Sequence, residues 1–360
     1  MKNFSIYLLS VFICLCACEK DNGGPAYAPG KDKVDNPIEE PQTPLDPVTE
    51  HVIVGYATYW ETVMPDPTLM THINYAFAHI KNDFESLDIK KPNRLTKIAG
   101  LKEKNPDLKV MLSVGGWGAG NFSEMAADEN HRRKFCENCL AAVQKYGLDG
   151  IDLDWEYPTS SSAGISSSPA DTKNFNLLLA DMREVLGSEL LLTMASSSSA
   201  KYVDFKTAMK YLDFVNIMTY DMGKPPYHNA GLYPSSSTKR SCDESVEYHR
   251  DAGVPYNKIV LGMPFYGHGN DVDFTSECLD FRDIKTDGYV EKWDNVAMVP
   301  YLADESGTMV LSYDNERSIG LKADYVKSRG LLGAMYWNIE ADDSSWTLSK
   351  AVASRLLSTE

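Results

Sequence analysis

Three carboxylic acids alternate with apolar residues in the stretch Leu148–Pro158, which reads LDGIDLDWEYP. Side chains along a β-strand point alternately to its two faces, so Asp152, Asp154 and Glu156 should share one face, each about 7 Å of strand from the next. Carboxylates this close cannot all ionise at low cost, so at least one pKa should be raised and a proton shared. A carboxyl group that keeps its proton near neutral pH can serve as a general acid.

The opposite face of the same stretch is apolar and carries Ile151, Leu153 and Trp155. An alternative interpretation is an exposed edge strand with a solvated acidic face, because most carboxylates are exposed. However, helix-like segments flank this strand, as is typical of a strand buried on both faces of a parallel sheet. Three carboxyl groups in such a place are costly unless they have a function. We therefore favour a catalytic site.

The acidic stretch resembles the signature of the family 18 glycoside hydrolases, the chitinases and their relatives. The shared pattern is four acids at fixed spacing followed by Tyr-Pro, here Asp149-x-x-Asp152-x-Asp154-x-Glu156-Tyr157-Pro158. Two further segments resemble the family, namely Ser113-x-Gly115-Gly116 and Met218-x-Tyr220-Asp221. The resemblance extends over the chain from about residue 52 to residue 355.

This resemblance implies catalytic roles for four residues. Glu156 would protonate the glycosidic oxygen, and Asp154 would orient and polarise the 2-acetamido group of the substrate. Asp152 would hold a proton against Asp154, and Tyr220 would hydrogen-bond the acetamido carbonyl. Asp149 has the wrong strand parity to face the same side, so we interpret it as structural.

Aromatic side chains follow most of the predicted strands, where they would surround the acids. Aromatics with a polar group favour half-wet clefts, so their convergence indicates a surface on which sugar rings stack. The resemblance implies that Met218 and Asp221 line the acetamido subsite and that Trp337 forms its floor. The substrate-binding residues expected in all are Tyr56, Trp60, Phe77, Gly116, Trp117, Met218, Asp221, Tyr266 and Trp337.

The predicted reaction is hydrolysis of β-1,4 links between N-acetylglucosamine units, in chitin or its oligosaccharides. A retaining glycosidase with its own nucleophile needs a second carboxylate, and Asp221 is the only other acid at a predicted strand end. We therefore expect the substrate's N-acetyl oxygen to attack, through an oxazolinium intermediate. One alternative is an endo-β-N-acetylglucosaminidase acting on the chitobiose core of N-glycans. Another is a non-catalytic glycan-binding protein, but such proteins typically lose the acid that Glu156 retains.

Eight apolar, strand-like runs alternate with amphipathic, helix-like segments. We expect strands at Val52–Trp60, Thr71–Ile80, Leu108–Gly116, Asp149–Tyr157, Leu190–Ser196, Phe214–Asp221, Ile259–Tyr266 and Leu331–Ile339. We expect helices at Asn93–Lys104, Ser123–Tyr146, Ala170–Leu186, Thr238–Ala252 and Asn315–Ser328. This alternation predicts an α/β fold that closes as a (β/α)8 TIM barrel, with its chemistry at the carboxyl ends of the strands. A doubly wound open sheet is the alternative, but no Gly-rich phosphate loop follows the first strand.

Residues 269–310, between the seventh strand and its helix, differ from many relatives. Those relatives carry an inserted α+β subdomain, whereas here a short, loop-sized insert and a low cleft wall are expected. His268 stands where many relatives have Arg, and its role stays open.

The chain begins with a targeting segment, residues 1–18, in which Lys2 precedes an apolar run. Its end, Leu15-Cys16-Ala17-Cys18, resembles a bacterial lipobox, which implies a lipid on Cys18; the alternative is ordinary secretory cleavage after Ala17. Residues 19–50 are rich in Pro and acidic residues and predict a disordered tether. Residues 51–360 would form the barrel. We expect an exported protein, lipid-anchored to the bacterial outer membrane or cell surface and without other membrane contact.

The composition of the 360-residue chain, with a net charge of −16, argues against binding nucleic acid. Cys136 and Cys139 are neighbours on a predicted helix, but a metal site would need a second close pair or histidines. We therefore expect no metal and no cofactor, and a monomer. Whether Cys136, Cys139, Cys242 and Cys278 form disulfides stays open.

Overall fold

The computed structural model describes residues 48–275 and 278–357. The predicted signal segment, its lipidation residue Cys18 and nearly all of the tether lie outside the described residues. Within the described ranges, no helix is long and apolar enough to cross a membrane.

Eight parallel strands form a closed barrel, as predicted. They are β1 (Val52–Thr58), β2 (His72–Ile80), β4 (Lys109–Gly115), β5 (Gly150–Asp154), β6 (Leu191–Ser197), β7 (Phe214–Met218), β8 (Ile259–Pro264) and β14 (Gly333–Trp337). Each strand pairs in parallel with the next, and β14 closes the ring by pairing with both β8 and β1. A short strand, β3 (Leu87–Ile89), adds antiparallel to the end of β2.

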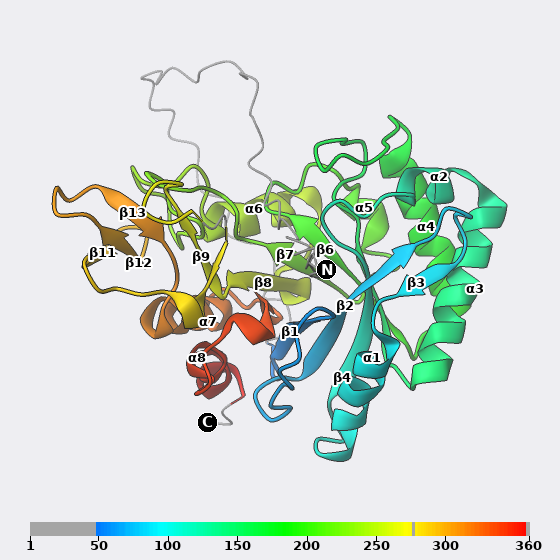
Figure 1. Cartoon of the computed structure of the whole chain (residues 1–360). Coiled ribbons are helices and arrows are strands. Elements are labelled where there is room, and N and C mark those ends of the chain that lie inside the picture. Colours follow the sequence, from blue (N-terminus) through cyan, green and yellow to red (C-terminus); the bar gives the residue numbers. More distant parts are fainter. Residues whose placement is uncertain (1–47, 276–277, 358–360) are drawn as a thin grey trace, which may run out of the picture.

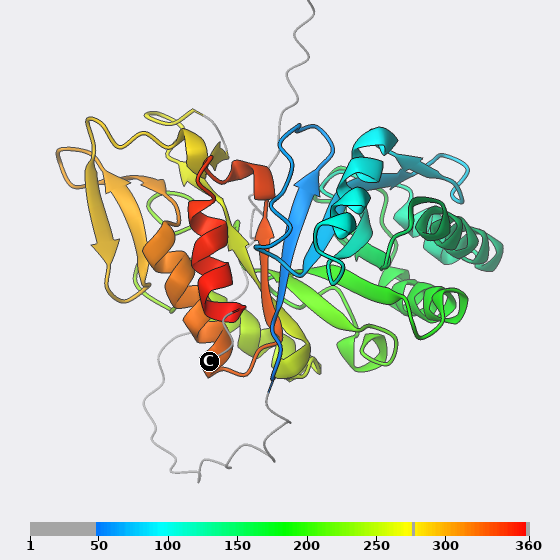
Figure 2. The ribbon, with the colours of Figure 1, turned by 90° about the horizontal axis from the view of Figure 1, so that it is seen from below.

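Helices surround the barrel on its outer side (Figures 1 and 2). They are α1 (Pro92–Ala99), α2 (Phe122–Ala127), α3 (Glu129–Tyr146), α4 (Asp171–Leu186), α5 (Phe205–Ala208), α6 (Cys242–Ala252), α7 (Glu316–Ser328) and α8 (Thr347–Leu356). The single-turn helices are η1 (Gly100–Glu103), η2 (Tyr256–Lys258), η3 (Phe281–Asp283) and η4 (Ile339–Ala341). The predicted helix 123–146 is divided at Asp128, whose extended backbone ends α2 and whose side chain caps α3.

The outward face of β5 packs against helices as its apolar pattern predicts. Trp155, just beyond the strand, is 2% exposed and stacks on Phe122 of α2, with ring centroids 5.2 Å apart. Phe175 of α4 meets the same indole edge-on. Ile151 and Leu153 are fully buried in the same cluster. The acids are thereby held toward the inside of the barrel.

The insert after the seventh barrel strand is present, but the expectation that it is only a loop is wrong. It forms a five-stranded antiparallel sheet in the order β10-β9-β13-β12-β11. These strands are β9 (Tyr266–Gly269), β10 (Leu279–Asp280), β11 (Val290–Asp294), β12 (Val299–Ala303) and β13 (Met309–Ser312). Leu302, Val310, Leu311 and Tyr313 give this sheet a small apolar core of its own. It projects from the barrel on the side of α7 and α8 (Figures 1 and 2).

Candidate active site

Asp152 lies in the barrel interior, where four side chains from four other strands donate to its carboxylate. Tyr56 Oη and Ser113 Oγ each lie 2.8 Å from Oδ2. Thr193 Oγ1 and Asn216 Nδ2 lie 2.6 and 3.2 Å from Oδ1. Burial raises the pKa of Asp152, and these hydrogen bonds oppose the rise. A carboxylate that accepts hydrogen bonds on both oxygens is suited to keep its negative charge.

Asp154, the last residue of β5, has a contrasting environment. It is 4% exposed, and its Oδ1 has no hydrogen-bond partner in the described part of the chain. Burial raises its pKa well above the ordinary value, and the negative charges of Glu156 and Asp152 raise it further. Burial and the two neighbouring charges therefore favour the protonated form of Asp154.

Glu156 lies just beyond the end of β5, so the predicted strand to Tyr157 is too long at this end. Its side chain is half-buried, and burial followed by the charge of Asp221 raises its pKa to about 7. A hydrogen bond with Tyr157 opposes this rise. Near neutral pH about half of such a group holds a proton, which suits a general acid.

The segment that follows β7 brings Tyr220 and Asp221 to the same region. Burial and then the charge of Asp154 raise the pKa of Tyr220 well above its ordinary value, so its phenol stays protonated. Asp221 has a left-handed backbone with φ 56°, and its N–H donates to Asn229 Oδ1 over 2.7 Å. Tyr266 Oη and His268 Nε2 each lie 2.6 Å from Asp221 Oδ1. His268 thus has a defined position, holding Asp221.

Trp337, at the end of β14, gathers a first group of the predicted aromatic residues. Its indole stacks on Phe77 with ring centroids 5.6 Å apart and an interplanar angle of 18°. Tyr56 and Trp60 lie at tilted angles with centroids 5.7 and 6.1 Å from it. Tyr56 and Phe77 are almost buried, whereas Trp60 is 44% exposed. This group presents one exposed and one half-buried indole, over two rings that support them.

A second aromatic group lies next to Glu156. Trp117 meets Tyr157 at 6.4 Å between centroids, and Tyr157 stacks on Tyr202 at 4.7 Å with an angle of 5°. Tyr202 carries no signal in the sequence, because it lies in a loop far from any of the motifs.

Gly116 fills a steric role in this structure. Its φ is +95°, and a Cβ at this position would lie 2.6 Å from the Phe77 ring. Its N–H donates to the carbonyl of Asp154 over 2.9 Å. The glycine therefore lets the end of β4 pack against Phe77 and the end of β5, and it is a weaker candidate for direct substrate contact.

Two of the four donors to Asp152, Thr193 and Asn216, are not among the residues predicted from the sequence. Both are fully buried polar residues, Thr193 next to the apolar start of β6 and Asn216 within the otherwise apolar β7. That contrast is a usable signal, because a buried polar group needs a partner. Asp149, in turn, accepts from Val110 N and Lys102 Nζ, each over 2.7 Å, as its structural interpretation predicts.

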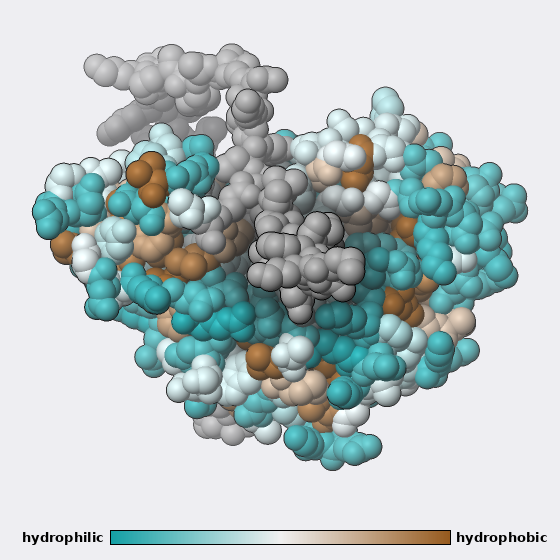
Figure 3. All heavy atoms as spheres, viewed as in Figure 1, coloured by the Kyte–Doolittle hydropathy of each residue, from teal (hydrophilic) through white to brown (hydrophobic). Residues whose placement is uncertain are grey.

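No cluster of three or more His, Cys, Asp or Glu side chains that could hold a metal occurs among residues 48–275 and 278–357. Cys136, Cys139 and Cys242 are free, buried thiols. Burial raises the pKa of Cys242 to about 11, so this thiol stays protonated. Hydrophilic residues cover much of the face shown in Figure 3, and the hydrophobic ones are scattered in small groups.

A closed parallel barrel with a carboxyl cluster at the ends of its strands defines a TIM-barrel enzyme, and a glutamate with a raised pKa among further acids suits glycoside hydrolysis. Residues 52–342 match the model of the family described as glycosyl hydrolases family 18. The chain belongs to this family and is a chitinase-like hydrolase.

Curated relatives and solved structures agree with this assignment. The chain is 32% identical to chitinase A1 of Niallia circulans, over 87% of this chain and 60% of that protein. It is 32% identical to probable chitinase 2 of Drosophila melanogaster, over 82% and 73% of the two chains. A family 18 N-acetylglucosaminidase from Paenibacillus barengoltzii has a TM-score of 0.77 at 37% identity, covering 85% of this chain and all of that one. This chain thus spans less than two thirds of chitinase A1.

Proposed function

We propose that this protein hydrolyses β-1,4-N-acetylglucosaminide links in chitin or chitooligosaccharides, with retention of configuration and with assistance from the substrate. The observation that carries the proposal is the contrast between the three acids. Asp152 is held by four donors, Asp154 has a buried oxygen without a partner in residues 48–275 and 278–357, and burial raises the pKa of Glu156 to about 7. The names of two curated relatives, chitinase A1 and probable chitinase 2, support this substrate class.

In the first step, Glu156 would transfer its proton to the glycosidic oxygen as the bond to the anomeric carbon breaks. The N-acetyl carbonyl oxygen of the same sugar would form the new bond to that carbon, giving an oxazolinium ion. Asp154 would accept a hydrogen bond from the acetamido N–H through its unpartnered oxygen. The Tyr220 hydroxyl would donate to the acetamido oxygen and hold it in position for attack.

In the second step, the Glu156 carboxylate would take a proton from water as that water opens the oxazolinium ring. Two inversions at one carbon give a retained product, and Glu156 regains its proton. Asp221 is a poor alternative nucleophile, because Tyr266 and His268 already engage its Oδ1. This engagement favours substrate assistance over attack by an enzyme carboxylate.

A second candidate activity is the release of single N-acetylglucosamine units. It is motivated by the Paenibacillus barengoltzii structure, which is described as an N-acetylglucosaminidase and which this chain covers completely. The chitobiose core of N-glycans remains a third candidate substrate, with the same chemistry.

One experiment separates these substrates. The protein is incubated with chitotetraose, with cellotetraose and with a high-mannose glycoprotein, and the products are followed by mass and by NMR. We expect retained-anomer chitooligosaccharides and no cleavage of cellotetraose, whose 2-hydroxyl cannot form an oxazolinium ring. Cleavage of cellotetraose, or an inverted first product, would contradict the mechanism. Release of the glycan alone would favour the N-glycan core, and exclusive release of monosaccharide would favour the N-acetylglucosaminidase.

We also propose that the protein is exported and carries a lipid on Cys18. The support is the sequence of residues 1–50, in which an apolar segment ends in a lipobox-like motif and a Pro-rich stretch follows.

A further inference from the structure

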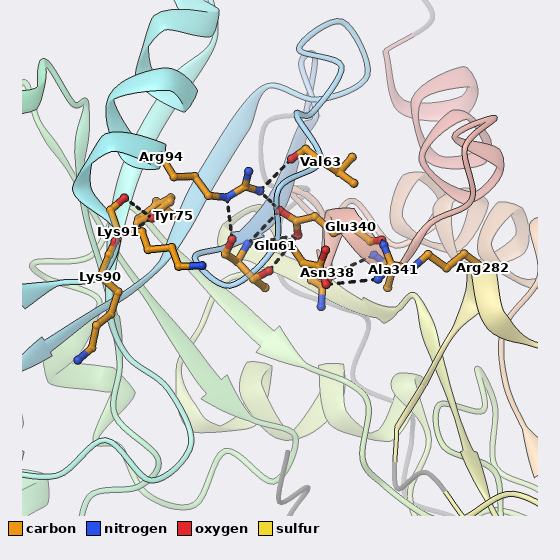
Figure 4. A network of polar contacts seen from close by, with 11 residues as sticks. Glu61, Val63, Tyr75, Lys90, Lys91, Arg94, Arg282, Asn338, Glu340 and Ala341 are labelled. Atoms are coloured by element: carbon orange, nitrogen blue, oxygen red, sulfur yellow. Dashed lines mark hydrogen bonds and ion pairs between the residues drawn. The ribbon is translucent and has the colours of Figure 1, made fainter. Parts of the chain in front are cut away.

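A buried polar network lies behind the first aromatic group, and the proposed chemistry does not use it. Arg94 of α1 and Glu340 of η4 form an ion pair with 2.5 Å between Nη2 and Oε1. Their side chains are 9% and 0% exposed. The pair joins two parts of the chain that are 246 residues apart, between the end of β1 and the end of β14 (Figure 4).

Both members of the pair also hold the backbone around Trp60. Arg94 Nε donates to Thr58 O and its Nη2 donates to Val63 O, each over 2.9 Å. The Glu340 carboxylate accepts from Thr58 N, with 3.2 Å to each oxygen. Thr58 precedes Trp60 by two residues and Val63 follows it by three, so the network holds the loop on both sides of the indole.

Trp60 needs such support because burial does not fix it. Its side chain is 44% exposed and lies in a segment without helix or strand between β1 and β2. Glu340 follows Trp337 by only three residues and accepts from Thr58, so it connects the two chain segments that carry the indoles, whose centroids are 6.1 Å apart. Arg282 of η3 adds a second connection, from Nη1 to Glu340 O over 2.6 Å and from Nη2 to Glu61 Oε1 over 3.3 Å.

We propose that Arg94 and Glu340 are positioning residues, which hold Trp60 and Trp337 at the separation that binds a sugar chain. This inference rests on the proposed carbohydrate-binding function. Arginine is required for its shape, because one planar guanidinium here reaches two carbonyls and a carboxylate that the single ammonium of lysine cannot reach together. A buried ion pair adds little net stability but fixes geometry where it joins two elements.

The test measures binding of chitotetraose by titration calorimetry, in a Glu156→Gln background that prevents turnover. Arg94→Lys should raise the Kd about fivefold or more, which is within the range of binding free energy that one aromatic contact contributes. The matched control is Arg132→Lys. Arg132 is 8% exposed and binds Asp181 Oδ2 over 2.8 Å and Ala126 O over 3.0 Å, in the layer of α2, α3 and α4. The control should lower Tm without changing the Kd by as much as about twofold.

A double-mutant cycle separates positioning from general destabilisation. If Arg94 acts through Trp60, then Arg94→Lys should weaken binding further by less than about twofold once Trp60→Ala is present. Should Arg94→Lys fail to fold, Glu340→Gln, which keeps size and one acceptor oxygen, takes its place in the same cycle.

The outcomes are distinct. If the Glu156→Gln protein does not bind chitotetraose, the proposed function fails. If it binds and the network variants leave Kd unchanged, or if their effects simply add to that of Trp60→Ala, the positioning inference is overturned.

Discussion

At the scale of single residues, environment gives three similar carboxyl groups three different properties. Asp152 has hydrogen-bond donors on both oxygens, Asp154 has a buried oxygen with no donor among the described residues, and Glu156 is half-buried at the strand end. Spacing along the strand predicts that the acids lie together, but it cannot predict which one holds a proton. That depends on Thr193 and Asn216, which come from strands distant in the sequence.

Glu156→Gln tests the general acid directly. The amide keeps the size of the side chain but cannot protonate a leaving group, so kcat on chitooligosaccharides should fall by about 10² to 10⁴ or more. The fold should be retained, as judged by circular dichroism and Tm. The same substitution with less than a tenfold loss would show that another group supplies the proton.

The pH dependence of activity should follow the raised pKa of Glu156. The acid must be protonated in the first step, so kcat/KM should decline as pH rises through about 7, where burial places this pKa. A pH–rate profile measured on a soluble chitooligosaccharide checks this. An alkaline limb near pH 4 to 5, where free carboxyls titrate, would contradict the assignment.

The same shift makes a prediction for stability. A folded-state pKa above the unfolded value means that the folded chain binds more protons between about pH 4.5 and 7, so this group's contribution falls as pH rises through that window. Glu156→Gln removes the cost of ionising the buried group. Its Tm relative to the original protein should therefore be higher at pH 8 than at pH 5, and equal differences at both pH values would speak against a raised pKa.

At the scale of elements, apolar periodicity predicts all eight barrel strands, while their ends depend on tertiary contacts. The predicted strand Asp149–Tyr157 is longer than β5, because Glu156 turns away from the ladder. The prediction of a loop for the insert is wrong because β11, β12 and β13 have only four or five residues each. The sequence of such a short strand, taken alone, resembles that of a loop. They are stabilised by Leu302, Val310 and Leu311, which bury one another across the sheet.

The two aromatic groups should contribute unequally. Trp337 stacks on Phe77 and also contacts Tyr56, which itself donates to Asp152, so it connects the aromatic surface to the acids. Trp337→Ala should lose on the order of 1 kcal/mol or more of substrate-binding free energy, beyond what burial of the ring alone contributes. It should also reduce turnover more than Trp117→Ala does. Steady-state kinetics of both variants on chitotetraose, with Tm as a control, check this order. Negligible losses in both would contradict the stacking surface.

At the scale of the whole molecule, the net charge argues against an anionic partner but does not select a sugar substrate. The net charge of −16 repels anionic surfaces, whereas an uncharged glycan is indifferent to it. The strand and helix alternation is sufficient to predict a barrel, because eight crossovers leave few other closures. It is not sufficient to predict the substrate, since chitin and N-glycan cores carry the same acetamido group.

The proposed anchor makes a prediction for the full-length chain. A lipid-modified Cys18 would hold the protein at a membrane, with each buried CH₂ of its acyl chains contributing about 0.8 kcal/mol. Cys18→Ser removes the sulfur that would carry the lipid, so the protein should move from the membrane pellet to the soluble fraction after export. Cys16→Ser is the matched control, because it changes a cysteine of the same apolar segment but keeps the modified position, and it should stay in the pellet. A Cys18→Ser protein that still pellets fully with membranes, and resists extraction by salt, would rule out the lipid anchor and leave the apolar segment itself as the attachment.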